Sequence, residues 1–205
     1  MSEQANSATR LEAWLAISVE RGFLTDQIPR HIAIASAYKS HLSQGCLWLD
    51  LGSGGGIPGL VIGHDRPDTR GILLDSGHRR CEFLREAIQE LALDNLSVVE
   101  GRGEVLARSH DVPVDVVVAR SFNPPPVTAE IAARFLKLGG LLVVSEPPDS
   151  RPERWPESGL RELGLEFLSI DDSNEQAHLA VLRKVAETTM KFPRRDGTPA
   201  KSPLW

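Results

Sequence analysis

The 205-residue chain contains only two cysteines, Cys46 and Cys81, and neither has a CxxC partner. Two isolated cysteines cannot supply a disulfide framework, and the histidines lack metal-ligand spacing, so we expect no disulfides and no metal site. Long apolar runs are also missing, and residues 1–10 are polar rather than a charged stretch followed by an apolar one. We therefore expect no membrane span and no secretory signal. The sequence predicts a cytoplasmic protein that makes no contact with membranes.

Aromatic residues are scarce, at 5% of the chain, and the four tryptophans are scattered. Such scattering favours packing roles over a surface on which bases stack. Hydrophobic residues at 41% and charged residues at 25% are typical of a globular protein, and the length fits one domain. The net charge is −5, yet residues 183–205 hold six Lys or Arg and two acids. This basic end on an acidic body predicts contact with a polyanion, with a solvated tail as the alternative.

Two helical patterns come first, one over 11–19 and one over 29–45, and apolar strands then alternate with helices. Strands are predicted at 46–51, 71–74, 96–99, 114–119, 141–144, 165–170 and 178–182. Near-continuous apolar strands separated by helices are typical of a parallel sheet covered on both faces, and the short last connection predicts an antiparallel hairpin at one edge. We therefore predict an α/β fold with seven strands. It has three parts: a helical cap (1–45), the sheet domain (46–185) and a basic tail (186–205).

The sharpest motif is a glycine loop, Asp50-Leu-Gly-Ser-Gly-Gly-Gly-Ile-Pro-Gly59, which follows a predicted strand and opens a helix. Its last glycines satisfy the GxGxxG spacing of dinucleotide-binding proteins. However, the carboxylate of Asp50 would repel a pyrophosphate, and Pro58 withdraws a backbone donor that an anion needs. A dinucleotide is therefore disfavoured.

A carboxylate at Asp50 suits a cationic ligand, such as the aminopropyl arm of S-adenosylmethionine. Asp75 ends the next predicted strand, where an acid can accept hydrogen bonds from both ribose hydroxyls. The alternative is a tight glycine turn with two incidental carboxylates. The loop and its surroundings thus predict a methyl-donor site made by Asp50, Gly52, Ser53, Gly54, Gly55, Asp75 and Ser76.

The third and fourth predicted strands end at the same edge of the sheet. Gly103 and Glu104 follow the third strand and are expected to flank the adenine. Arg120 ends the fourth and is expected to point into the crevice, where it would position the substrate; a structural ion pair is the alternative. Asn123-Pro-Pro is similar to the Asn-Pro-Pro-Tyr signature of amino-group methyltransferases, but Pro126 stands where the stacking aromatic would be. We expect a rigid loop there.

Motifs spread along the chain carry a resemblance to a known family. The tail reads Lys191-Phe-Pro-Arg-Arg-Asp-Gly-Thr-Pro-Ala-Lys-Ser-Pro-Leu204. The matching segments are 30–32, 50–59, 73–76, 79–80, 83–84, 102–104, 119–120, 136–140, 178–184 and 191–204. Through them the chain resembles the small-subunit (16S) rRNA guanine-N7 methyltransferases, the RsmG family.

This resemblance implies a seven-stranded, Rossmann-like class I S-adenosylmethionine-dependent methyltransferase that modifies guanine N7 in 16S rRNA of the small ribosomal subunit. Because guanine N7 has an exposed lone pair, no general base is needed, and no catalytic acid or base is expected; aligning the reactants and removing water can supply most of the catalysis. We expect a monomer. The implied cofactor residues are Asp50, Gly52, Gly54, Asp75, Gly103, Glu104 and Arg120, and the candidates for RNA contact are Arg30, Lys191, Arg194, Arg195 and Lys201.

Two departures from the family pattern keep other functions open. No Asn-Leu-Thr segment occurs in residues 1–29, and Ser145-Glu-Pro-Pro148 stands where the family has Lys-Gly. The altered substrate side favours two alternatives: a methyltransferase of the same fold acting on a small molecule or another RNA, and a cofactor-binding paralogue without catalysis. A basic face would favour RNA, and an enclosed pocket would favour a small molecule.

Overall fold

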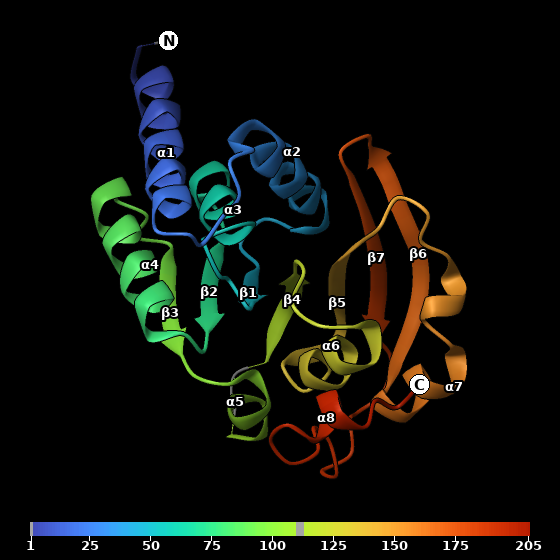
Figure 1. Cartoon of the computed structure of the whole chain (residues 1–205). Coiled ribbons are helices and arrows are strands. Elements are labelled where there is room, and N and C mark those ends of the chain that lie inside the picture. Colours follow the sequence, from blue (N-terminus) through green and yellow to red (C-terminus); the bar gives the residue numbers. More distant parts are fainter. Residues whose placement is uncertain (1, 110–112) are drawn as a thin grey trace.

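A computed structural model describes residues 2–109 and 113–205. Within them, seven strands form one sheet in the order β3-β2-β1-β4-β5-β7-β6 (Figure 1). The strands are β1 (Leu47–Leu51), β2 (Arg70–Asp75), β3 (Leu96–Glu100), β4 (Val114–Ala119), β5 (Leu136–Glu146), β6 (Leu165–Asn174) and β7 (Ala177–Lys184). The α-helices are α1 (Ser2–Glu20), α2 (Ile28–Tyr38), α3 (Gly59–Asp65), α4 (His78–Leu91), α5 (Gly103–Ser109), α6 (Pro125–Ala132), α7 (Glu157–Leu163) and α8 (Thr198–Lys201), with 3-10 turns at Lys39–His41 and Pro152–Arg154.

The first five strands run parallel, whereas β7 pairs antiparallel with both β5 and β6. The predicted seven-stranded α/β sheet and the antiparallel hairpin at its edge are therefore confirmed. Successive side chains of a strand face opposite sides of the sheet. In β1, Leu49 and Leu51 belong to one hydrophobic core and Trp48 to the other.

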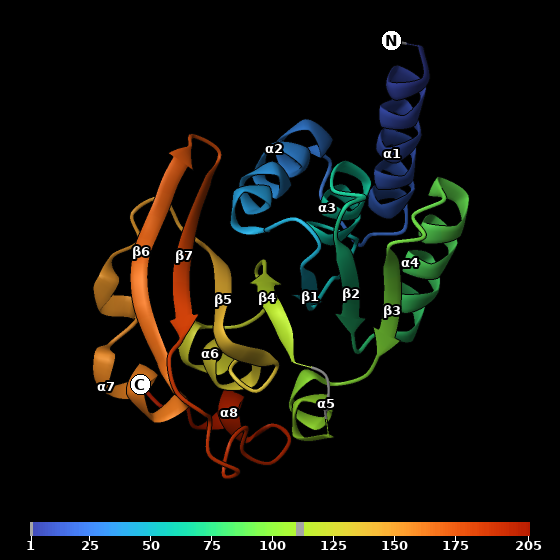
Figure 2. The ribbon, with the colours of Figure 1, turned by 180° about the vertical axis from the view of Figure 1, so that it is seen from behind.

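Helices cover both faces of the sheet (Figure 2). Residues of α1, α2, α3 and α4 pack in the core that contains Trp48, and residues of α5, α6 and α7 pack in the other core, together with Phe192 near the C-terminus. The N-terminal helices therefore share a core with the sheet. The division at residues 45 and 185 stays a prediction. None of the helices within residues 2–109 and 113–205 is long and apolar enough to cross a lipid bilayer.

Two local predictions differ from the structure. The fifth strand begins at Leu136, earlier than predicted, because the Gly139-Gly140 pair lies within the strand rather than in a turn before it. Leu136 already pairs with Val114, and the register then shifts, with Gly139 at a φ of +81°. The predicted proline loop is also shorter than expected, because Pro125 begins α6, a position that proline tolerates well.

Candidate functional site

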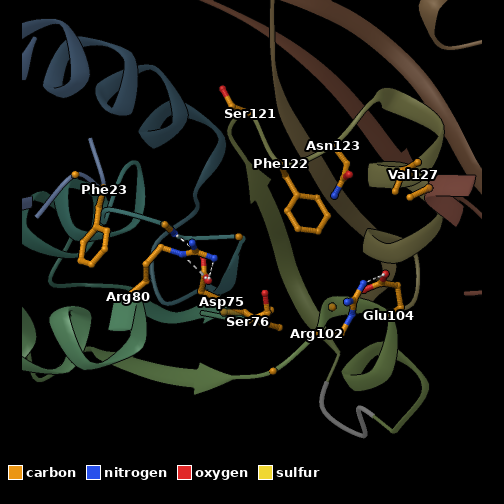
Figure 3. Close-up of a pocket in the computed structure, with 17 residues that line it drawn as sticks. Phe23, Asp75, Ser76, Arg80, Arg102, Glu104, Ser121, Phe122, Asn123 and Val127 are labelled. Atoms are coloured by element: carbon orange, nitrogen blue, oxygen red, sulfur yellow. Dashed lines mark hydrogen bonds and ion pairs between the residues drawn. The ribbon is translucent and has the colours of Figure 1, made fainter. Parts of the chain in front are cut away.

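A cavity of about 470 Å³ opens where β1, β2, β3 and β4 end (Figure 3). The chain order reverses between β1 and β4, and in open α/β sheets ligands bind at this point, beyond the carboxyl ends of the strands. The volume is in the usual range for small-molecule sites. Of the ten predicted cofactor residues, the cavity brings together Gly52, Gly54, Asp75, Ser76, Gly103 and Glu104. Asp50, Ser53, Gly55 and Arg120 are not in its lining.

The glycine loop forms one wall of this cavity in a backbone conformation that favours glycine. Gly52 and Gly54 have φ of +81° and +54°. A Cβ on Gly52 would lie 2.4 Å from Cδ2 of Phe122, so that ring packs directly on the loop. A Cβ on Gly54 would have no atom nearer than 3.8 Å. Since Gly54 lines the cavity, the space above it is available to a ligand.

Asp75 is held in a fixed position at the end of β2. Its Oδ2 accepts a hydrogen bond from the backbone N–H of Gly54 at 2.9 Å, and its Oδ1 accepts one from the N–H of Gly77 at 2.8 Å. The guanidinium of Arg80 pairs with the same Oδ1 at 2.6 Å (Figure 3). Arg80 also lines the cavity, and we did not predict it as a site residue. The sequence signal that could have identified Arg80 is its position as a basic residue in the first turn of the helix that follows Asp75.

Glu104 places a second carboxylate at the far side of the cavity from Phe23 (Figure 3). Burial alone would raise the pKa of Glu104, but hydrogen bonds from its own backbone N–H, from Arg102 and from the N–H of Gly197 hold that pKa below its usual value. The distance between Arg102 Nη2 and Glu104 Oε1 is 3.1 Å. Glu104 is therefore an ionised acceptor at neutral pH, suited to an amino group of a ligand.

Asp50 lies beneath the loop, fully buried, rather than on the cavity wall. Its Oδ2 accepts the N–H of Gly59 at 3.0 Å, and a Cβ on Gly59 would lie 2.6 Å from that oxygen. The other oxygen, Oδ1, is buried without a hydrogen-bond partner among the described residues. Burial raises the pKa of Asp50 to about 7, although Ser53 and the Gly59 N–H favour the ionised form. The carboxylate is therefore sealed from the cavity by the loop, and it does not meet a cationic ligand directly as we expected.

The segment after α1 closes the opposite end of the cavity. Gly22 and Phe23 line it, and the Phe23 ring meets the Phe83 ring edge-on at 5.7 Å. Ser18 Oγ donates a hydrogen bond to the Gly55 carbonyl at 3.0 Å, and a Cβ on Gly55 would lie 2.5 Å from that hydroxyl. The predicted cap therefore supports the glycine loop directly. Nothing in the sequence pattern indicated this contact.

A second cavity, of about 430 Å³, adjoins the first and shares Ser121 and Asn123 with it. Its charged and ionisable lining comprises Arg30, Arg120, Arg154, Glu146 and His178. The side chain of Glu146 is 1% exposed and forms an ion pair with Arg154 at 2.7 Å. Trp155 Nε1 and the Ser150 hydroxyl also donate to it. The charge of Glu146, in the segment Ser145–Pro148 that departs from the family pattern, is thus balanced by Arg154. Among the remaining charged side chains of the cavity, Arg30 and Arg120 are both cations.

Arg120 is oriented by a histidine from the helical cap. Burial, and then the charge of Arg120, lower the pKa of His31, so its ring is neutral at pH 7. Its Nδ1 accepts a hydrogen bond from Arg120 Nη2 at 2.8 Å, while Nε2 lies 3.1 Å from the Thr25 carbonyl, to which it donates. This pair fixes the guanidinium at the second cavity.

The candidates for RNA contact separate into three environments. Arg30 lines the second cavity, and Arg195 and Lys201 are exposed. Lys191 pairs with Glu162 at 3.3 Å. Arg194 is bound to Glu130, whose side chain is fully buried.

Comparison with known proteins links the chain to one family. The GidB family, described as rRNA small subunit methyltransferase G, matches residues 16–148. The ribosomal RNA small subunit methyltransferase G of Deinococcus radiodurans is 35% identical, over 96% of this chain and 84% of that protein. The protein of the same name from Thermotoga maritima is 35% identical, over 76% of this chain and 68% of that protein.

Solved structures support the fold. A SAM-dependent methyltransferase from Aquifex aeolicus superposes with a TM-score of 0.58 at 17% identity, covering 77% of this chain and 94% of that one. A likeness at this identity shows the fold alone, which is the Rossmann-like class I fold that the sequence predicted. The family match and the near full-length relative go further: the chain belongs to the rRNA small subunit methyltransferase G family, a family of S-adenosylmethionine-dependent methyltransferases.

Proposed function

We propose that this protein methylates guanine N7 in 16S rRNA of the small ribosomal subunit, using S-adenosylmethionine, as a monomer in the cytoplasm. The observation that carries the proposal is the pair of adjoining cavities that meet at Ser121 and Asn123. One holds fixed carboxylates and a glycine cradle, and the other has three arginines, Arg30, Arg120 and Arg154, in its lining. A donor and an RNA acceptor bound in these two cavities would meet at the shared wall.

The first cavity fits the cofactor residue by residue. When bound, S-adenosylmethionine supplies a methyl group activated by a sulfonium cation. Asp75 lies at the end of β2, where ribose hydroxyls can reach it. Its carboxylate already accepts the N–H groups of Gly54 and Gly77 and two nitrogens of Arg80, so the ribose would take the place of Arg80. Glu104 is placed to accept one from the adenine amino group. Gly52 and Gly54 let the backbone approach the ligand closely.

The second cavity suits a nucleotide of a polyanion. Arg30, Arg120, Arg154 and His178 offer donors to phosphate oxygens, and the Arg120–His31 pair fixes the direction of one of them. An arginine pressed against the base would oppose the positive charge that N7 methylation creates, so we assign Arg120 to a phosphate. Its role is positioning, and the exposed lone pair of N7 needs no general base.

The direct test is transfer of labelled methyl groups to small subunits from cells that lack this protein, followed by nucleoside analysis. Labelled 7-methylguanosine in 16S rRNA is the expected product. If the protein binds S-adenosylhomocysteine but labels no subunit, a small-molecule substrate or a non-catalytic role replaces the proposal.

Replacing Arg120 with alanine is expected to lower kcat/KM on small subunits by about a hundredfold, the scale of a lost charged hydrogen bond at a positioned substrate. The affinity for S-adenosylhomocysteine should change less than about twofold, because Arg120 does not line the first cavity. Arg151→Ala, at an exposed arginine outside both cavities, is the matched control. Equal losses in the two variants would contradict a positioning role.

The substitution Gly54→Ala is expected to weaken S-adenosylhomocysteine binding by about ten- to a hundredfold, because the added Cβ would occupy space that the ligand needs. The positive φ adds about 1 kcal/mol of destabilisation. Gly45→Ala is the matched control, since Gly45 has a φ of +73° and open space around its Cβ position, but lies outside the cavity. Calorimetry should show normal affinity for Gly45→Ala and reduced affinity only for Gly54→Ala.

A further inference from the structure

The basic C-terminal segment is anchored to the body of the protein rather than free in solvent. Arg194 forms a two-point ion pair with Glu130 of α6, with Nη2–Oε2 at 2.6 Å and Nε–Oε1 at 3.0 Å, and its backbone N–H donates to Oε1 at 2.7 Å. Arg108 of α5 donates to the Arg194 carbonyl at 2.9 Å. Phe192 is buried in the same core as Val127, which lines the first cavity.

The same segment reaches the first cavity through three contacts. Arg102 Nε pairs with Asp196 at 2.7 Å, and Arg102 Nη2 pairs with Glu104. The backbone of Gly197 helps to hold the pKa of Glu104 below its usual value. Ala200 of α8, which lies beside α6 in Figure 1, lines the cavity itself. Arg102 therefore bridges the segment and the carboxylate at this end of the cavity.

We propose that residues 191–201 form the wall of the cofactor cavity at Glu104, and that this segment sets the affinity and selectivity for the adenine end of the cofactor. This inference rests on the proposed function, and it gives the segment a task apart from RNA contact. Asp196 acts as a positioning residue: through Arg102 it holds Glu104 in the direction in which an adenine 6-amino group can donate to it.

The first test changes a residue that lines the cavity and leaves the Arg194–Glu130 ion pair intact. Ala200→Leu extends an exposed side chain at the cavity, so it should weaken S-adenosylhomocysteine binding by about tenfold in calorimetry while the protein stays folded. Ser202→Ala changes the next exposed residue after this segment, outside the cavity, and should bind normally. Normal binding by Ala200→Leu would overturn the proposal.

The second test separates positioning from loss of structure. S-inosylhomocysteine presents an oxygen where adenine has its amino group, so the wild-type protein should bind it at least about tenfold more weakly than S-adenosylhomocysteine. In Asp196→Ala this preference should fall to within about threefold, because Glu104 is no longer held. An equal loss of affinity for both ligands would mean that the segment is only structural. If the wild-type protein binds neither ligand, the proposed function itself fails. If the wild-type protein prefers S-adenosylhomocysteine and both variants bind as the wild type does, this inference is wrong but the proposed function stands.

Discussion

Arg194→Ala is expected to lower the free energy of unfolding by about 3 to 5 kcal/mol, the usual cost of leaving a buried charge without its partner. The Glu130 carboxylate is 0% exposed, and Arg194 is the cation that pairs with it. Typical domains are stable by only about 5 to 15 kcal/mol, so the loss is a large fraction of the total. Urea unfolding at neutral pH, followed by circular dichroism, measures it.

Two further variants show whether the buried charge is the cause. Arg195→Ala removes the neighbouring exposed arginine and should cost less than about 0.5 kcal/mol. Combining Arg194→Met with Glu130→Leu removes both charges and keeps the volume filled, so it should recover most of the stability lost in Arg194→Ala. The explanation fails if Arg194→Ala and Arg195→Ala are equally stable.

The sheet could be predicted because its strands are nearly continuous apolar runs between turn signals. The fourth strand was predicted at 114–119 and is observed as Val114–Ala119. The glycine loop was predicted to bind a ligand because its glycines lie between a predicted strand and a predicted helix, an arrangement that is typical of nucleotide and cofactor sites. Where glycines lie inside a strand, as at Gly139 and Gly140, they were read as a turn, and the predicted strand therefore began too late.

Side-chain directions were harder to predict, and Asp50 illustrates the reason. We expected its carboxylate to meet a cationic ligand, and the structure places it beneath the loop, against Gly59. Side chains alternate along a strand, so Asp50 shares the side of β1 that Trp48 occupies, opposite to Leu49 and Leu51. That alternation was present in the sequence and points the carboxylate towards α3.

Contacts between distant segments left almost no local signal. Charge alone could not distinguish a docked basic tail from a solvated one. One clue was Glu130, an acid within the apolar helix Pro125–Ala132, because a buried carboxylate needs a partner. Its partner, Arg194, lies far along the chain, and a single sequence does not identify such a pair.

The buried Asp50 is expected to make the protein less stable as the pH rises from about 4 to about 7. Burial raises the pKa of this carboxyl from 3.8 to about 7. Between these two values the unfolded chain has lost the proton while the folded protein still holds it, so the folded state binds more protons and raising the pH favours unfolding. The stability that the folded protein gains by holding the Asp50 proton is fully present below pH 3.8 and is lost as the pH rises past about 7. The shift corresponds to about 4 kcal/mol.

Asp50→Asn isolates this effect, because the amide stays neutral at every pH and can still accept the Gly59 N–H. In urea unfolding between about pH 4 and about pH 8, the stability of the wild type minus that of Asp50→Asn should fall by about 4 kcal/mol and then level off. Asp26→Asn, at an exposed carboxylate, controls for the loss of one acidic group. A difference that stays constant across this range would mean that Asp50 is ionised in the folded protein. Its buried Oδ1 would then carry a charge at neutral pH without a hydrogen-bond partner among the described residues.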